Sequence, residues 1–302
     1  MTDPFLHDSV LLEESATLLA GCQRVLDGTA GAGGHALRLS AGAQVLAIDK
    51  DPFAVQAAQA RLGDTGRVLQ IDFADAARDA KVRAFRPDGL LLDLGLSSPQ
   101  IDDASRGFTF RPGAPLDMRM NAGEGISAAG WLNTADEHEL SHVFRDFGDE
   151  RRARALARQV VKRRATRGFA ISDDLVGAIR GALGPTSGAP DFARLFQAVR
   201  IAVNGELDRL KDALPDLLAV LEPGGVMAVI SYHSGEDRIV KHLFRDWARS
   251  CICPPEQPTC TCRGRPLGEL LTRHPVLAGE AETAKNPRAR SAHLRGFRKG
   301  AA

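Results

Sequence analysis

Residues 25–49 read VLDGTAGAGGHALRLSAGAQVLAID, and this stretch decides the fold. A short apolar run ends in Asp27, a glycine-rich segment follows, and a second apolar run ends in Asp49. The pattern predicts a strand, a glycine turn, a helix and a second strand that ends in an acid. Glycines let the backbone approach a ligand closely, and a carboxylate at the second strand's tip can accept hydrogen bonds from ribose hydroxyls. The stretch therefore predicts a pocket for a nucleoside-bearing cofactor.

The composition describes a chain that can bury a substantial core. It has 302 residues, and 44% of them are hydrophobic. The formal net charge is +1, so the overall charge does not indicate a nucleic-acid partner. A net charge this small still allows a local basic surface. We find no apolar run of membrane-spanning length and no export leader, and five cysteines do not suit a disulfide framework. These features predict a cytoplasmic protein without membrane contact.

Apolar runs alternate with helical segments along much of the chain. A helix capped by Ser9 should precede the first strand, and Pro52 suits the first turn of the helix after the second strand. The runs are almost wholly apolar, as in parallel strands covered on both faces, and predict a doubly wound α/β sheet. The expected strands are residues 25–27, 45–48, 68–71, 89–94 and 226–232, and further helices are expected at 51–62, 74–85 and 236–250.

The pattern changes after the fourth expected strand. Residues 96–125 are rich in Ser, Pro, Gly, Asp and Arg and predict a long irregular loop. Helical patterns follow, including a long stretch at 192–221 that should be interrupted at Pro215. The simplest organisation is an α/β domain made of residues 1–105 and 199–302, with a helical insertion for substrate recognition at 106–198.

The glycine loop by itself suits two cofactors. Gly31, Gly33, Gly34 and His35 lie in GAGGHA, which satisfies the dinucleotide pattern G-x-G-x-x-A and so allows NAD. Asp27 argues against NAD, because a carboxylate beside the loop would repel a pyrophosphate. The same carboxylate can hold the ammonium of a methionine moiety, directly or through water.

Two further segments favour S-adenosylmethionine. Asp72 and Phe73 follow the third expected strand, where the acid can accept from the adenine amino group and the ring can pack on the adenine. Taken singly, Asp72 as a helix cap and Phe73 as a core residue are equally good interpretations. Asp93 ends the fourth strand and leads into Ser97-Ser98-Pro99-Gln100, where methyltransferases of this shape place the loop that receives the methyl acceptor.

Several longer tracts resemble a known family. DLGLSSPQIDD begins at Asp93, PLDMRM at Pro115 and NPRARS at Asn286. They are similar to the bacterial small-subunit ribosomal RNA cytosine-N4 methyltransferases known as RsmH or MraW, and the resemblance runs nearly the full length of the chain. It implies a Rossmann-like, S-adenosylmethionine-dependent methyltransferase fold. It also implies N4-methylation of one cytidine in the decoding region of 16S rRNA, within the assembled small ribosomal subunit.

The resemblance assigns the family's cofactor contacts to residues of this chain. Gly235 departs from the family, which usually has leucine there. The implied contacts are Gly33, Gly34 and His35 in the glycine loop, Asp49 at the ribose, Phe73 beside the adenine, and Asp93 and Gln100 along the acceptor loop.

Methyl transfer to a cytosine amine requires acceptors on its N–H bonds, because the nitrogen lone pair is delocalised into the ring. We expect a backbone carbonyl of Ser98 or Pro99 to be one acceptor. A side-chain oxygen of Asp93 or Ser97 should be the other, and Asp117 is a second candidate base. Methylation at carbon 5 would instead require a cysteine nucleophile, and no Pro-Cys follows the fourth strand, so direct transfer without a covalent intermediate is expected.

An enzyme that acts on a base usually extrudes it from its stack and needs aromatic or polar groups to receive it. Tyr232, at the end of the fifth expected strand, is the best-placed aromatic residue, and His233 beside it is a further catalytic candidate. Phe108 and Phe110 are further candidates, whereas Trp131 and Trp247 are expected in the core.

Two stretches are locally basic. Arg154, Arg158 and Lys162 share one helical face at i, i+4 spacing. A solvated surface is one interpretation, and a face that tracks RNA phosphates is the other, which an rRNA substrate favours. The basic segment 285–299 is expected to become ordered only with RNA or cofactor.

Four cysteines, Cys251, Cys253, Cys260 and Cys262, form two C-x-C pairs. Four thiols are the number that a structural zinc needs, but this spacing is tighter than the common C-x-x-C, and free thiols in a surface loop are the alternative. We expect no metal in the reaction and leave zinc in this loop open.

Two other functional classes compete with an RNA methyltransferase. A nicotinamide-dependent dehydrogenase accounts for the glycine loop and Asp49 but for none of the other tracts. A ribosome-assembly factor would use the same fold for binding alone. His7 is expected to be a surface or cap residue, and the sequence leaves the oligomeric state open, a homodimer included.

Overall fold

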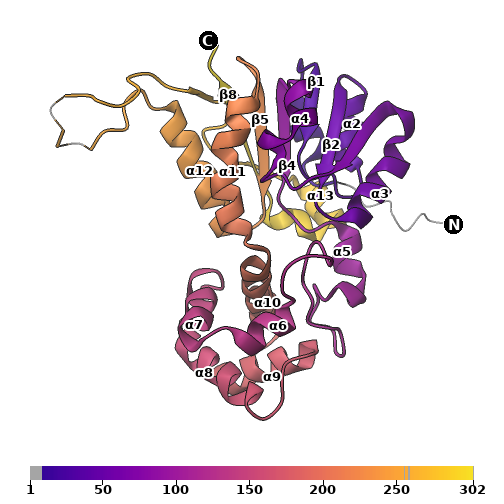
Figure 1. The fold of residues 1–302 in the computed structure, drawn as a ribbon, viewed down its shortest axis with the longest axis vertical. Helices are drawn as coiled ribbons and strands as arrows, with labels where there is room; N and C mark the ends of the chain where they lie inside the picture. Colours follow the sequence, from indigo (N-terminus) through magenta and orange to yellow (C-terminus); the bar gives the residue numbers. More distant parts are fainter. Residues whose placement is uncertain (1–8, 255, 258, 302) are drawn as a thin grey trace. The chain divides into compact units, whose positions relative to one another are not determined.

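The computed structural model describes residues 9–254, 256–257 and 259–301, so His7 lies outside the described residues. Contacts divide the chain into two units. The first comprises Met1–Leu96 and Leu207–Ala302, and the second comprises Ser97–Glu206, a wider segment than the expected insertion at 106–198. Figure 1 shows the helices and strands of each unit.

The first unit is built on a mixed sheet in the order β3-β2-β1-β4-β5-β8-β6, with β7 paired to β8. The first five strands in the chain pair in parallel, which confirms the expected α/β fold, whereas β8 is antiparallel to its neighbours. The strands are β1 (Arg24–Asp27), β2 (Gln44–Asp49), β3 (Gly66–Gln70), β4 (Gly89–Asp93), β5 (Val226–Ser231), β6 (Gly268–Leu270), β7 (Val276–Leu277) and β8 (His293–Lys299).

Helices cover both faces of this sheet. Alternate strand residues point to opposite sides, so that Val25 packs in one core cluster and Leu26 in the other. The first cluster includes residues of α2 and α3, and the second includes residues of α4, α11 and α12. The helices of this unit are α1 (Leu12–Leu18), α2 (Gly34–Ser40), α3 (Pro52–Leu62), α4 (Ala80–Phe85), α11 (Glu206–Val220), α12 (Ser234–Ala248) and α13 (Glu280–Lys285).

Three expectations about local structure are wrong. Ser9 does not cap α1, because the N-cap position is Leu11 and no side chain bonds there. The long helical stretch does not break at Pro215, which lies inside α11. It breaks at Gly205, whose φ of 60° lies in the left-handed region that ends helices. The basic segment 285–299 is not an unpaired tail, because β8 occupies the sheet between β5 and β6.

The second unit is helical, with a core of its own. Trp131 and Phe144 are buried in this core, and Phe110 packs edge-on against Phe192 and Phe196. The expected core positions of Trp131 here and of Trp247 in the first unit are confirmed. Its helices are α5 (Ser98–Asp102), α6 (Ala128–Thr134), α7 (Glu137–Asp146), α8 (Ala153–Arg164), α9 (Ser172–Leu183) and α10 (Ala189–Asn204).

Across the part of the chain that the structure describes, no helix combines the length and the apolar character that crossing a bilayer requires.

Candidate cofactor and active site

The order of the strands reverses between β1 and β4. From β1 the chain proceeds to β2 and β3 on one side, and β4 and β5 lie on the other. In open α/β sheets, ligands bind outside the carboxyl ends of the strands at such a reversal. Asp27 ends β1, Asp93 ends β4 and Asp49 ends β2, so the three predicted acids lie at this edge.

The glycine loop is held by one of these acids. Gly31 and Gly33 have φ values of 51° and 79°, which side chains rarely adopt, and a Cβ at Gly34 would collide with the hydroxyl of Ser9. The Gly31 N–H donates to Asp49 Oδ2 at 3.0 Å, and the Asp51 N–H donates to Asp49 Oδ1 at 2.9 Å. Burial still raises the pKa of Asp49 to about 6. Asp49 thus fixes the loop, and its remaining lone pairs are available to a ribose.

Two carboxylate oxygens at the reversal are buried and lack a partner among the described residues. Asp27 is 1% exposed, and its Oδ1 accepts from the Thr29 N–H at 3.1 Å, whereas its Oδ2 accepts from nothing. Oδ1 of Asp93 is equally buried and unpaired. Burial raises the pKa of Asp27 to about 6 and also raises the pKa of Asp93. Because an uncompensated buried charge is costly, this arrangement fits a ligand that brings positive charge.

Two side chains lie against the Asp93 carboxylate. The His35 Nε2 lies 3.0 Å from the carbonyl oxygen of Val10, which can only accept, so this nitrogen carries a hydrogen and the Nδ1 faces Asp93 Oδ2 at 3.7 Å. The Tyr232 hydroxyl donates to the Asp93 carboxylate. Burial and this negative neighbour raise the pKa of Tyr232 far above its usual range. Tyr232 therefore acts on Asp93 as a neutral hydrogen-bond donor.

His233, predicted beside Tyr232 as a catalytic residue, is tied to the start of α12. Its Nδ1 accepts from the Glu236 N–H at 3.4 Å, and its Nε2 lies 3.1 Å from Glu236 Oε1. The Tyr232 N–H donates to Glu236 Oε2 at 2.8 Å. These contacts give His233 a helix-capping role, and they show that the buried Glu236, which sequence reasoning did not single out, fixes the backbone at Tyr232.

Asp72 and Phe73 lie after β3, as expected. Asp72 Oδ1 accepts from the Ala74 N–H at 3.0 Å, and its Oδ2 pairs with Arg209 at 2.7 Å. Asp72 caps no helix, because the next helical turn begins at Ala76 with Asp75 at its N-cap position. Asp72 instead holds the turn after β3 and pairs with Arg209, and a contact with the adenine stays a prediction. Phe73 lies beside the glycine loop, because a Cβ placed on Gly28 would be 3.6 Å from its Cβ.

Thr29 is a second residue of this site, after Glu236, that the sequence did not point to. Its N–H donates to Asp27, and its Oγ1 accepts from the Asp93 N–H at 2.6 Å. One side chain therefore ties together the ends of β1 and β4. The only signal in the sequence is a polar residue inside the loop directly after Asp27.

We expect Gly95→Ala to impair the site without unfolding the protein. A Cβ at position 95 would lie 2.6 Å from Cε2 of Tyr232, so the ring must shift, and we expect the hydrogen bond from its hydroxyl to Asp93 to weaken. Loss of one such oriented donor should lower kcat by roughly 10-fold or more. Steady-state kinetics and thermal unfolding measure both effects. Gly42→Ala is the matched control, because a Cβ there meets nothing within 4 Å, and equal losses in the two variants would contradict the argument.

The predicted acceptor loop opens the second unit. Gln100 is buried, and its Oε1 accepts from the Ser97 N–H at 3.0 Å, which fixes the backbone where α5 begins. Ser98 and Pro99 form the first turn of α5, and the structure describes their backbone alone. A cofactor contact of Gln100 and the roles of Ser97, Ser98 and Pro99 in accepting from an amine stay predictions.

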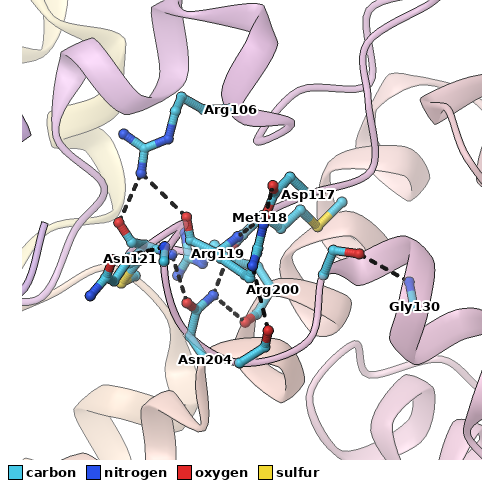
Figure 2. A network of polar contacts seen from close by, with 12 residues as sticks. Arg106, Asp117, Met118, Arg119, Asn121, Gly130, Arg200 and Asn204 are labelled. Atoms are coloured by element: carbon cyan, nitrogen blue, oxygen red, sulfur yellow. Dashed lines mark hydrogen bonds and ion pairs between the residues drawn. The ribbon is translucent and has the colours of Figure 1, made fainter.

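The tract PLDMRM forms a clamped loop in the second unit (Figure 2). The Asn204 Nδ2 donates to the Met118 carbonyl at 2.8 Å, and the Met120 N–H donates to Asn204 Oδ1 at 2.9 Å. Asp117 makes a two-pronged ion pair with Arg119, at 2.7 and 2.9 Å, which holds the pKa of its carboxyl below the usual range. A carboxylate held in this way is a weak base, so Asp117 suits an orienting role better than proton removal.

Comparison with known proteins gives full-length matches. A family model described as "MraW methylase family" matches residues 4–300. Ribosomal RNA small subunit methyltransferase H of Gemmatimonas aurantiaca is 57% identical over 298 residues, which cover 97% of this chain and 95% of that protein. The protein of the same name from Syntrophotalea carbinolica is 45% identical over 309 residues, 98% of each chain. Both matches therefore span nearly the whole chain.

Proposed function

Because the chain belongs to the MraW methylase family, we propose that it transfers a methyl group from S-adenosylmethionine to N4 of one cytidine in the decoding region of 16S rRNA. The substrate is the assembled small ribosomal subunit. Relatives named for the small-subunit RNA support this substrate class. The observation that carries the proposal is the pair of buried, unpaired carboxylate oxygens of Asp27 and Asp93 at the strand reversal.

The cofactor is S-adenosylmethionine, which supplies an electrophilic methyl group on a positively charged sulfur. The Asp27 carboxylate compensates positive charge on this methyl donor. Asp49 and the glycine loop hold its ribose, and Phe73 packs on its adenine. NAD fits this set less well, because the Asp27 carboxylate would face a pyrophosphate and both would be negative.

Asp93 is the acceptor for the cytosine amine. Its carboxylate takes a hydrogen bond from an N–H of the amine and then the proton that leaves when the new N–C bond forms. The raised pKa suits this task, because the carboxylate is a better base than an exposed aspartate. Tyr232 orients it, and a backbone carbonyl of Ser98 or Pro99 is the proposed second acceptor.

The test is incubation of the protein with labelled S-adenosylmethionine and small subunits that lack the modification, followed by nucleoside mass spectrometry. We expect N4-methylcytidine at one position, and less of it with free 16S rRNA. Label on carbon 5 of cytosine would refute the proposed chemistry. Retention of the labelled cofactor without any methylated nucleoside would favour a non-catalytic assembly factor, and retention of NAD instead would favour a dehydrogenase.

Helix α8 offers a surface for the RNA phosphates. Arg154, Arg158 and Lys162 are exposed along one face of this helix, opposite the buried Leu156. No described carboxylate pairs with these three cations, whereas Arg145 in the same unit pairs with Asp146 at 2.7 Å. Unpaired cations at helical spacing suit a phosphate backbone, so α8 is the proposed RNA-binding face.

Replacement of Arg154, Arg158 and Lys162 by alanine should weaken subunit binding and flatten its salt dependence. Each lost phosphate contact lowers the slope of log K against log salt by about 0.7–0.9, so the triple variant should lose roughly 2 to 3. Binding titrations at several salt concentrations measure the slope. Arg145→Gln is the control. An unchanged slope in the triple variant would exclude α8 as the RNA face.

A further inference from the structure

Four thiols converge in the segment between α12 and β6. The sulfur atoms of Cys251, Cys253, Cys260 and Cys262 all lie within 4.8 Å of one another. The Cys251–Cys260 and Cys260–Cys262 pairs are 3.7 and 3.5 Å apart, and the Cys253–Cys260 and Cys251–Cys262 pairs are 4.0 and 3.9 Å apart. The two C-x-C pairs therefore bring all four sulfur atoms into one cluster.

These spacings match a single metal ion better than disulfides. Four sulfurs in a tetrahedron around zinc, with bonds of about 2.3 Å, are about 3.8 Å apart. A disulfide would bring two of the sulfurs to about 2.05 Å, and all four cysteines are free thiols. A four-sulfur tetrahedron selects zinc or iron, and zinc is the usual ion where no redox chemistry is involved.

No apolar core holds this segment in place. None of the described residues from Arg249 to Pro266 is buried, and Ile252 is 45% exposed. Ordering a segment of this kind costs conformational entropy, which in most protein segments is offset by the burial of apolar side chains. The convergence of four exposed or half-buried thiols therefore needs another source of stabilisation, and metal–sulfur bonds are a strong one.

The backbone around the cluster is arranged as thiolate ligands require. The Ile252 N–H donates to Cys262 Sγ at 3.4 Å, and the Gly264 N–H also donates to this sulfur. N–H donors stabilise negative charge on metal-bound sulfur and fix its orientation. Arg263 lies next in the chain, and its guanidinium donates to the carbonyl oxygens of Asp246 and Arg249 at the end of α12.

We propose that Cys251, Cys253, Cys260 and Cys262 bind one structural zinc ion. The four thiols lose their protons on binding, so the ion and four thiolates carry a net charge of −2, and no oxidant or reductant takes part. The site joins the end of α12 to the segment that leads into β6. That segment is anchored on the other side by the Leu267 N–H, which donates to the Trp247 carbonyl at 2.7 Å.

The test is metal analysis of protein purified without a metal-affinity tag or chelator. We expect one zinc per chain, and cobalt substitution should give the visible and near-ultraviolet bands of a tetrahedral tetrathiolate. Cys260→Ser/Cys262→Ser should lose the zinc. Cys22→Ser is the matched control, because Cys22 is buried elsewhere and bonds to the Asp88 carbonyl, and this variant should keep the metal.

Wild-type protein provides a second readout that does not depend on the folding of a variant. A mercurial that blocks thiols should release the zinc in proportion to the thiols modified, and trypsin should then cleave faster after Arg263. Iron in place of zinc, disulfides by mass spectrometry, or metal that persists in the double variant would each overturn the proposal. So would a metal-free protein whose thiols react at the same rate with and without added zinc.

Discussion

Asp27→Asn should abolish retention of S-adenosylmethionine while the protein stays folded. The substitution keeps the size of the side chain and an acceptor for the Thr29 N–H, but it removes the buried charge that compensates the donor. Loss of one charged partner in a buried pair costs roughly 3 kcal/mol, which is about 150-fold in affinity. Calorimetric titration measures the loss. Asp64→Asn, at an exposed position, is the control and should bind normally.

The same variant should change how stability depends on pH. The pKa of Asp27 is raised to about 6 in the folded protein, above its ordinary value, so the cofactor-free fold binds this proton more tightly than the unfolded chain does. This contribution is fully present below about pH 4 and is lost as the pH rises to about 6, by roughly 3 kcal/mol. Denaturant unfolding at one pH near the lower end of that range and at one pH above it should show a smaller difference in Asp27→Asn than in the wild type. Identical pH dependence in both proteins would contradict the burial argument.

Asp93→Asn should lower kcat by roughly 100- to 1,000-fold and change cofactor affinity far less. The amide keeps the shape of the carboxylate and can accept from Tyr232, but it cannot take the proton of the amine. Because burial raises the pKa of Asp93, wild-type activity should fall with decreasing pH earlier than an ordinary aspartate would dictate, and the variant should lack this acidic limb. Single-turnover rates across pH, with separate cofactor titrations, distinguish the two effects. Full turnover and unchanged cofactor affinity in Asp93→Ala would exclude the proposed role.

The parallel part of the sheet was predictable because its strands are buried on both faces. A run such as residues 89–94, which is apolar except for Asp93, is typical of a strand buried on both faces. The C-terminal strands were not predictable in this way, because β6 and β7 are three and two residues long. β8 reads HLRGFRK and resembles a basic tail, since sequence alone does not show that Arg295 is buried against Asp237 at 2.7 Å.

The candidate site, like the sheet, was only partly predictable from the sequence. The acids at the strand ends follow from the chain pattern, because parallel strands bring their carboxyl ends to one edge. Their partners depend on register and on distant segments. Asp72 pairs with Arg209 across 137 positions of sequence, and Thr29 reaches Asp93 only because β1 and β4 are neighbours. No local pattern specifies such pairs, so Asp72 and His233 were open to both a structural and a functional interpretation.

The position of β8 bears on the solubility of the protein. This strand pairs along all of β5, which ends one residue before Tyr232, and it also pairs with β6 and β7. Without β8 the parallel strands would end in β5, whose N–H and C=O groups on that side would form an open edge that can pair with other chains. β8 therefore protects the sheet beside Asp93 against edge-to-edge aggregation.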